Sequence, residues 1–506
     1  MPMRQPDCAS LAFSFSIKKI ANECRDGFVW KGVETRMDLP VFHLDFLGNR
    51  FLIAMIAVLH VIINHAMAVG AIPLIALMEW WGKKTGERRW DDLAYQILTV
   101  CFVITTTFGA LTGVGIWFST SLVNPYAIGS MIRVFFWAWF AEWIIFVSEV
   151  VLILLYYLLW KRWQGEWKRY HIALGGVLAL TSWLTMAIIV AILGYMMDVG
   201  NWTHEKSIAT AILNPIYLPQ LAFRTPLAMM TAGFFSLFLT YFFTRKEDPF
   251  QSAAARWISL WSLGWAPLCL AGGIWYWKAV PDSMVGNLAV ALGTQAFEGR
   301  YNVILDILLV SFLLALVTLL WSAVKPSRMP RFVLIIPFAV AIVSLGYFER
   351  VREFIRKPYV ISGYMYANGI RVDDYPLLNQ NGVLPYALYA DAKEVTEENH
   401  LQAGKEVFLI ACTRCHTTNG VNGILARLET MYGSDRWDRD TVLMYLKGMH
   451  NVRPYMPPFP GNNAELGALV DYLFSLRAYP APIKGAQTAD GSSIRAEKTY
   501  DDNTRG

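Results

Sequence analysis

Charged residues are scarce in this chain. Only 16% of its 506 residues are Asp, Glu, Lys or Arg, whereas 55% are hydrophobic. Because soluble domains typically carry about 25% charged residues, this composition excludes an ordinary soluble enzyme and indicates a protein that lies mostly in lipid. The net charge of +5 is better explained by Lys and Arg residues that orient membrane helices than by a nucleic-acid partner.

Cysteines are also few, and a signal peptide is not apparent. Of the six cysteines only Cys412 and Cys415 lie close together, so we expect no disulfide framework; the others are Cys8, Cys24, Cys101 and Cys269. Residues 1–42 have no long apolar core followed by a small-residue cleavage site. We interpret residues 1–48 as an N-terminal extension, with Met37 as an alternative start.

Long apolar runs are abundant. A helix needs about 20 residues to cross a bilayer. Eight runs are long enough: 50–78, 96–118, 132–160, 172–197, 226–244, 256–278, 301–323 and 332–349. The expected fold is all-α, with a polytopic transmembrane bundle of about eight spans over residues 49–356.

Basic residues are distributed unevenly among the linkers between these runs. Four linkers together hold fourteen Lys or Arg: 79–95, 160–171, 245–256 and 323–331. The alternate linkers 119–131, 197–223 and 279–299 hold only Lys206. Basic linkers favour the cytoplasmic side, so this bias predicts that both termini lie outside.

Hydropathy falls sharply after Arg356. We interpret 357–400 as a polar linker, 401–482 as a compact soluble domain and 483–506 as a polar tail. The helices expected in the compact domain run from Leu401 to Ile410, from Trp437 to Lys447 and from Ala464 to Leu476.

The compact domain contains a haem-attachment motif. Cys412 to His416 read C-x-x-C-H, in which two thiols form thioethers to the haem vinyl groups and His416 ligates the iron. Zinc binding is the alternative, but it would need a second ligand pair, which His450 alone does not supply. We therefore predict one covalent haem c, held by Cys412 and Cys415.

The second iron ligand is expected in the segment Tyr455 to Phe459. Met456 precedes two prolines that would hold its thioether against the haem, with Met449 and His450 as rival ligands. Residues 403–476 resemble a class I cytochrome c in Gly404, Phe408, the C-x-x-C-H motif, the Met-Pro-Pro segment, and a closing helix with Leu469, Asp471 and Tyr472. Methionine ligation favours electron transfer, since a six-coordinate iron has no open site.

Ionisable residues within the spans are candidates for function, because they are expensive in lipid. They include His60 and His65 in the first span and Glu142 and Glu149 in the third. The two glutamates are seven residues apart and share one helix face, where they could relay protons or support a haem. The alternatives are a structural pair of glutamates and satisfied core histidines; we expect core or interface packing for His65 and His171.

Residues 49–160 resemble subunit I of the cytochrome bd quinol oxidases. The resemblance rests on Ala57-Val58-Leu59-His60 with Ala68-Val69-Gly70, on Gly109 to Gly113, and on Glu142 and Glu149, which are one residue closer together than in the family. It implies that His60 is an axial ligand to a buried haem. Near the end of the bundle, Gly346-Tyr347-Phe348 and Glu353 to Tyr359 resemble the family's final ligand segment. There Glu353 would ligate a second buried haem and Arg356 would pair a haem propionate. A solvated Glu353 is the alternative.

Two departures from the family matter. The positions that match the ligands of its low-spin haem b are Thr225 and Asn302, the latter close to Arg300, and only residues 279–300 stand where the family has a long quinol-binding loop. We therefore expect haem c and two buried b-type or d-type haems, without the low-spin haem b.

The preferred hypothesis is a bd-like terminal oxidase that passes electrons between haem c and the buried haems and reduces oxygen. The alternative is an electron-transfer subunit of a larger respiratory complex that exchanges electrons with quinone or periplasmic cytochromes. A transporter or ion channel with a redox sensor is a third. Expected partners are the lipid bilayer, a second membrane subunit, and a soluble or complex-bound cytochrome. The expected location is the bacterial inner membrane, with both termini periplasmic.

Overall fold

The computed structural model describes residues 36–246, 248–292, 302–330, 333, 335–433 and 437–477. Residues 1–35, with Cys8 and Cys24, lie outside this description, as do Arg300, the side chain of Asn302 and the polar tail after 482.

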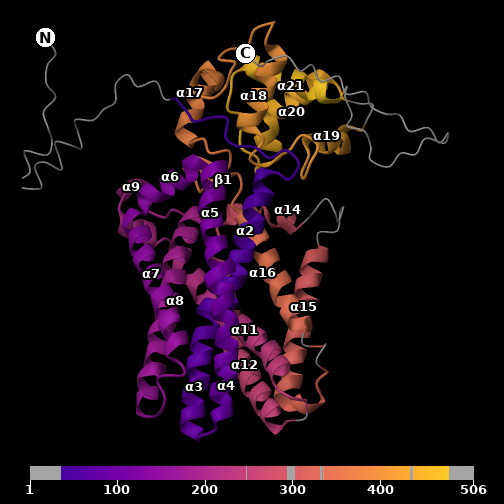
Figure 1. Ribbon diagram of the computed structural model, residues 1–506. Coiled ribbons are helices and arrows are strands. Elements are labelled where there is room, and N and C mark those ends of the chain that lie inside the picture. Colours follow the sequence, from indigo (N-terminus) through magenta and orange to yellow (C-terminus); the bar gives the residue numbers. More distant parts are fainter. Residues whose placement is uncertain are drawn as a thin grey trace, which may run out of the picture.

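Long helices form the body of the molecule (Figure 1). In chain order they are α2 (Asn49–Ile63), η1 (Asn64–Val69), α3 (Ala71–Thr85), α4 (Arg88–Ile104), η2 (Thr105–Gly109), α5 (Ala110–Val123), α6 (Pro125–Val134), α7 (Phe136–Leu159), α8 (Lys168–Met197), α11 (Tyr217–Phe243), α12 (Pro249–Ala279), α15 (Asn302–Val324) and α16 (Ile335–Ile355). Short helices occupy the connections: η3 (Gly165–Trp167), α9 (Trp202–Glu205), α10 (Ile208–Ile212), α13 (Asp282–Val285), α14 (Leu288–Leu292) and η5 (Pro326–Arg328).

Seven helical stretches among the described residues are long and apolar enough to cross a membrane. They are Asn49–Thr85, Arg88–Val123, Phe136–Leu159, Gly165–Met197, Tyr217–Phe243, Pro249–Ala279 and Asp306–Val324. The eighth predicted span corresponds to α16, whose last two turns carry Glu349, Arg350, Arg352 and Glu353. These results confirm an all-α, polytopic helical fold, and they add that α16 ends in a run of charge.

The first two membrane stretches each contain a wide helical turn. The π-helical segments η1 and η2 interrupt α2–α3 and α4–α5, and the two segments pack against each other. Wide turns of this kind are found mostly at functional sites, because they shift the register of the side chains around them. Here η1 begins four residues after His60, and η2 ends three residues before Thr112, which contacts His60.

The C-terminal domain sits at one end of the bundle, opposite the turn between α3 and α4 (Figure 1). It contains α18 (His400–Ala411), α19 (Ile424–Tyr432), α20 (Arg439–Val452) and α21 (Asn463–Arg477). The expected helices correspond to α18, α20 and α21, whereas α19 was not predicted. Gly404 lets α18 cross α21 closely, because a Cβ there would lie 2.0 Å from the Ala468 carbonyl oxygen.

The segment 357–400, expected to be a polar linker, is largely folded. It holds a hairpin of β1 (Tyr359–Ile361) and β2 (Met365–Tyr366), then η7 (Val372–Asp374), α17 (Tyr375–Asn381) and η8 (Leu384–Tyr386). Its apolar side chains share one core with α18 and α21. The buried Glu465 of α21 accepts hydrogen bonds from the backbone N–H groups of Val383 and Leu384, both at 2.8 Å. The segment therefore ties the C-terminal domain to the bundle.

Candidate haem sites and their junction

The C-x-x-C-H motif forms a single turn directly after α18. The N–H groups of Cys415 and His416 donate to the Cys412 carbonyl at 3.1 and 2.9 Å, so the motif is folded into a tight turn. The His416 Nδ1 lies 3.1 Å from the Asn422 carbonyl oxygen, so Nε2 is the nitrogen left for iron. A backbone partner of this kind orients metal-binding histidines generally. The arrangement fits a covalent haem c.

Met456 lies in the loop between α20 and α21. Its N–H donates to the Arg453 carbonyl at 2.8 Å, and its own carbonyl oxygen lies 2.6 Å from His450 Nδ1. The rival ligand His450 therefore holds the backbone of Met456, and the other rival, Met449, packs against the core of the C-terminal domain. The contact at Nδ1 leaves Nε2 of His450 unoccupied, as in His416, so Met456 stays the predicted second iron ligand with His450 as its rival.

Two segments of the C-terminal domain, one next to Met456 and one after His416, contact the bundle or the residues just before α2. On the Met456 side, the Tyr455 ring packs on Phe354 of α16 with 5.6 Å between ring centroids. On the His416 side, Asp45 Oδ1 accepts a hydrogen bond from the Thr418 N–H at 2.7 Å, and the Phe46 carbonyl accepts one from the Val421 N–H at 3.2 Å. These Thr418 hydrogen bonds lower the pKa of Asp45, although burial opposes them. These two segments of the C-terminal domain therefore rest on the start of α2 and the end of α16.

His60 lies on the face of α2 that packs against α5. Its Nδ1 is 3.2 Å from the Thr112 hydroxyl, and a Cβ at Gly113 would lie 3.3 Å from the ring Cε1. Glycine at 113 thus makes room for the imidazole, and Thr112 orients the ring in the way outer partners orient metal-binding histidines. These neighbours belong to the Gly109 to Gly113 segment of the predicted resemblance. The geometry fits a haem ligand that presents Nε2.

Glu353 lies in the last turn of α16 among basic side chains. Its Oε2 accepts from Arg50 at 3.0 Å, and its Oε1 lies 2.9 Å from Lys357 and 3.8 Å from Arg356. Both carboxylate oxygens are therefore in ion pairs. A haem iron on Glu353 would have to replace at least one of these pairs, so Glu353 fits an iron ligand less directly than His60 does.

The two glutamates of α7 differ in their surroundings. Glu149 accepts hydrogen bonds from the Ser182 hydroxyl at 2.6 Å and the Thr185 hydroxyl at 3.3 Å, both from α8. Glu142 is half-buried, and α7 around it exposes large apolar side chains such as Trp143 and Phe146. The structure therefore places Glu149 against α8 and leaves Glu142 at a more open position on the same helix.

Sequence reasoning missed a buried charged network between η1, α11 and α16. The Arg224 guanidinium is 1% exposed; it donates to Glu349 Oε1 at 2.5 Å and lies 3.4 Å from His65 Nε2. Arg352 donates to the other Glu349 oxygen at 2.8 Å. The sequence showed charged residues at the ends of the predicted spans, but it did not show which of them pair, because the partners are far apart along the chain. His65 packs inside this network.

A second network missed from the sequence lies at the opposite end of the bundle. Glu79 is fully buried, with Oε1 2.8 Å from Lys168 Nζ and 2.6 Å from His171 Nδ1, while its Oε2 accepts from the Tyr156 hydroxyl at 2.7 Å. Lys168 also pairs with Asp91. The cluster joins α3, α4, α7 and α8 near the basic turns.

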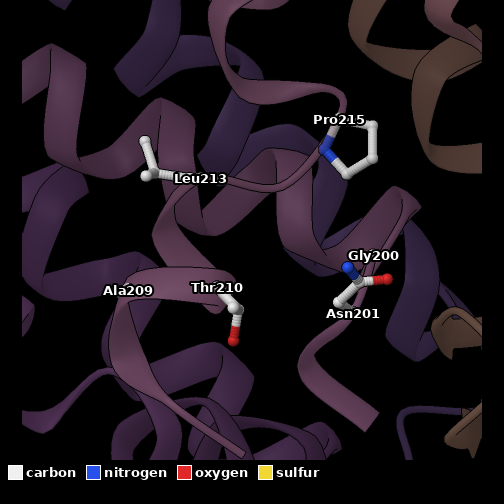
Figure 2. Close-up of a pocket in the computed structure, with 6 residues that line it drawn as sticks. All are labelled: Gly200, Asn201, Ala209, Thr210, Leu213 and Pro215. Carbon is white, nitrogen blue, oxygen red and sulfur yellow. The ribbon is translucent and has the colours of Figure 1, made fainter. Parts of the chain in front are cut away.

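Two further features bear on other ligands. The Trp183 indole donates to the Thr225 hydroxyl at 3.0 Å, so Thr225 is engaged in a protein contact where the family resemblance would place a haem ligand. A pocket of about 260 Å³ lies in the connection between α8 and α11 (Figure 2). It is lined by Gly200, Asn201, Ala209, Thr210, Leu213 and Pro215, which offer no titratable side chain.

Comparisons with known proteins found one family model and a similar solved structure. Residues 399–473 match the family model described as cytochrome C oxidase, cbb3-type, subunit III. A chain of the bd oxidase from Geobacillus thermodenitrificans has a similar fold, with a TM-score of 0.53 and 15% sequence identity over 64% of this chain and 90% of that chain. No curated protein sequence matches.

These matches confirm both predicted resemblances. The C-terminal match implies a covalent haem c and a role in electron transfer, and the structural match concerns the fold of the bundle. The protein therefore combines a helical, membrane-type bundle with the fold of a bd oxidase and a C-terminal cytochrome c domain.

Proposed function

We propose that this protein is a bd-like respiratory oxidoreductase in which the haem c domain exchanges electrons with haems held in the bundle, and that oxygen is reduced there. The observation that carries the proposal is the docking of the cytochrome c domain on the bundle through the segments that flank its predicted iron ligands. Tyr455, next to Met456, packs on Phe354, while Asp45 and Phe46 hold the segment after His416. A haem c bound between these segments would lie next to the bundle, where it could exchange electrons with haems held there.

In this proposal each predicted site residue has a role in binding a haem. Cys412, Cys415, His416 and Met456 hold haem c, and His60 holds a buried haem through Nε2, with Thr112 fixing its ring. Glu353 is the proposed ligand of a second buried haem, and Arg356 the partner of a haem carboxylate. When bound, the haems supply one-electron carriers and, where a coordination position stays open, a site for oxygen. The hydrogen bond between Trp183 and Thr225 supports the absence of the family's low-spin haem b.

In this proposal the two glutamates of α7 transfer protons. Glu149 can accept or release a proton while Ser182 and Thr185 donate hydrogen bonds to it. Glu142 lies two helical turns closer to the outer end on the same face. In this role Glu142 and Glu149 deliver protons toward the bundle haems.

Orientation and partners follow from the same arrangement. The C-terminal domain lies at the end of the bundle opposite the α3–α4 turn, which is one of the Lys- and Arg-rich connections (Figure 1). We infer that this end faces the periplasm of a bacterial inner membrane, where haem c is attached and where a soluble or complex-bound cytochrome can reach it. The lipid-facing side chains of α7 also leave room for a second membrane subunit.

The ion pairs of Glu353 favour one alternative. If Glu353 stays with Arg50 and Lys357, the bundle has one predicted ligand fewer, and the protein serves as an electron-transfer subunit without oxygen chemistry. It would then exchange electrons with quinone or periplasmic cytochromes as part of a larger complex.

The deciding experiment is the optical difference spectrum of the reduced, purified protein with and without carbon monoxide. A shift in a haem band other than that of haem c demonstrates an open iron site and supports the oxidase. A spectrum that does not change supports the electron-transfer subunit. His60→Ala should remove a buried haem while the haem c bands remain; retention of all non-c bands in that variant would refute His60 as a ligand.

A further inference from the structure

His450 holds the backbone of the predicted haem ligand Met456. Its ring Nδ1 lies 2.6 Å from the Met456 carbonyl oxygen. Because a carbonyl oxygen only accepts hydrogen bonds, Nδ1 must carry the hydrogen of this bond, and Nε2 carries none in the neutral ring. The contact therefore sets both the tautomer of His450 and the place of the Met456 backbone.

The segment around Met456 depends on this contact because two prolines follow it. Pro457 and Pro458 have no N–H group, so they cannot donate hydrogen bonds that would hold the loop. On the other side, the Met456 N–H donates to the Arg453 carbonyl oxygen at 2.8 Å, directly after α20. His450 supplies the partner of the Met456 carbonyl and thereby helps to set the direction in which the Met456 side chain leaves the loop.

His450 is itself placed by the hairpin of β1 and β2. The Tyr366 ring of β2 lies at 80° to the His450 ring, with 6.3 Å between ring centroids. Tyr366 also stacks on Tyr359 of β1 and meets Tyr375 of α17 edge to face, each with 4.8 Å between centroids. Met449, next to His450, packs against the same core. The last turn of α20 therefore rests on the hairpin.

The hairpin lies between the bundle and the cytochrome c domain and packs against both (Figure 1). Tyr366 belongs to the core of the cytochrome c domain, whereas Ile361 and Met365 belong to a core of the bundle. The bundle core includes the side chains of Phe135, Ile192 and Tyr195. The Ser362 N–H also donates to the Met196 carbonyl oxygen of α8 at 3.2 Å. A continuous series of contacts thus leads from α8 through the hairpin and His450 to Met456.

We propose that His450 is a positioning residue that holds Met456 on the iron of haem c through Nδ1, and that the hairpin couples this contact to the packing of the bundle. The inference rests on the haem c of the proposed function and does not depend on oxygen reduction. A thioether binds iron weakly, so its place on the iron depends on the groups that orient it, as in metal sites generally. A rearrangement at the outer end of α8 would then alter the ligation of haem c and its reduction potential. In the rival arrangement Nε2 of His450 binds the iron itself.

The test compares three variants of His450 in the full-length purified protein. The amide nitrogen of Asn lies as many bonds from the backbone as Nδ1 of His, whereas that of Gln lies as far as Nε2. His450→Asn should therefore keep the hydrogen bond to Met456, and His450→Gln and His450→Ala should lose it. Asn does not reach the iron in place of Nε2, so the same variant separates a positioning residue from a ligand.

The measured quantity is the affinity of ferric haem c for added imidazole, which competes with Met456 for the iron and is followed at the haem c bands. One net hydrogen bond changes an equilibrium constant by roughly 3- to 10-fold. His450→Ala and His450→Gln should therefore raise the imidazole affinity by this factor, and His450→Asn should leave it close to that of the unmodified protein. A loss of general stability alone would not produce this order of the three variants.

Two hairpin variants test the coupling to the bundle. Tyr366→Leu removes the ring that contacts His450, and it should raise the imidazole affinity by roughly 2- to 5-fold, as expected for the loss of an aromatic contact. Tyr366→Phe keeps that ring and should have little effect. If His450→Ala fails to incorporate haem, the comparison of Tyr366→Leu with Tyr366→Phe decides by the same measurement.

Magnetic circular dichroism of the unmodified ferric protein in the near infrared comes first, because it distinguishes methionine from histidine as the second ligand. Among the predicted haems only haem c has a methionine ligand, so absence of the methionine–iron signal would overturn the inference. An imidazole affinity raised equally by Asn and Ala at 450 would refute the role of the hydrogen bond, and no effect of Tyr366→Leu would refute the coupling. Absence of covalent haem from the unmodified protein would instead refute the proposed function itself.

Discussion

The contact between Tyr455 and Phe354 offers the sharpest test of how the cytochrome c domain docks. Phe354 packs against Tyr455 with 5.6 Å between ring centroids, and the Arg50 guanidinium lies 5.0 Å from the Phe354 ring centre. Such an aromatic pair contributes about 0.5–1.5 kcal/mol and an Arg–aromatic contact about 0.5–1 kcal/mol. Phe354→Ala should therefore weaken docking by about 1–2.5 kcal/mol, which is roughly 5- to 60-fold in the docking equilibrium.

Hydrogen exchange read by mass spectrometry measures this change. Exchange in segments 413–421 and 453–460, which contact the bundle, should accelerate by roughly the same factor, because it follows the population of the undocked state. Segments inside α8 should keep their rates, and Tyr389→Ala, which removes an exposed ring of the same outer region, should have no effect. Unchanged exchange in both contact segments would show that other contacts carry the docking and would refute the reasoning.

Three more predictions follow from single contacts. Glu79→Ala removes the buried carboxylate that Lys168 and His171 share, and it leaves Lys168 with Asp91 alone. We expect it to lower the free energy of unfolding in detergent by about 3–5 kcal/mol, whereas replacement of the exposed Glu87 by Ala should not. A loss below about 1 kcal/mol for Glu79→Ala would contradict the buried network. Gly404→Ala places a Cβ 2.0 Å from the Ala468 carbonyl oxygen, so thermal unfolding should show the cytochrome c domain destabilised by about 1–3 kcal/mol. Gly448→Ala adds its Cβ to open space and should leave the stability unchanged or raise it. Arg439 lowers the pKa of Asp471 below its usual 3.8, so their pairing stabilises the folded domain above about pH 3.8, and this stabilisation is lost as the pH falls further. Arg439→Gln should therefore raise the pH at which the domain unfolds in acid. An unchanged acid transition would contradict this account.

Local sequence patterns were sufficient for the broad organisation of the chain. Apolar runs predicted the membrane helices because lipid crossing depends mainly on length and hydropathy. The C-x-x-C-H motif predicted haem c because its ligands are neighbours in sequence. The helix α19 and the folding of 357–400 were missed, since short elements with mixed polarity depend on the core of the C-terminal domain for their stability.

The candidate sites depended on both the sequence and the tertiary structure. The sequence by itself determined the helical class, the haem-attachment turn and the candidate His60, because each is encoded within a few turns of chain. Only the tertiary structure decided that Arg50 pairs with Glu353, that Arg224 pairs with Glu349, and that Glu79 pairs with both Lys168 and His171. Ion pairs carry no sequence periodicity, and their partners are distant along the chain, so the charges could be recognised from the sequence whereas their pairing required the packed helices.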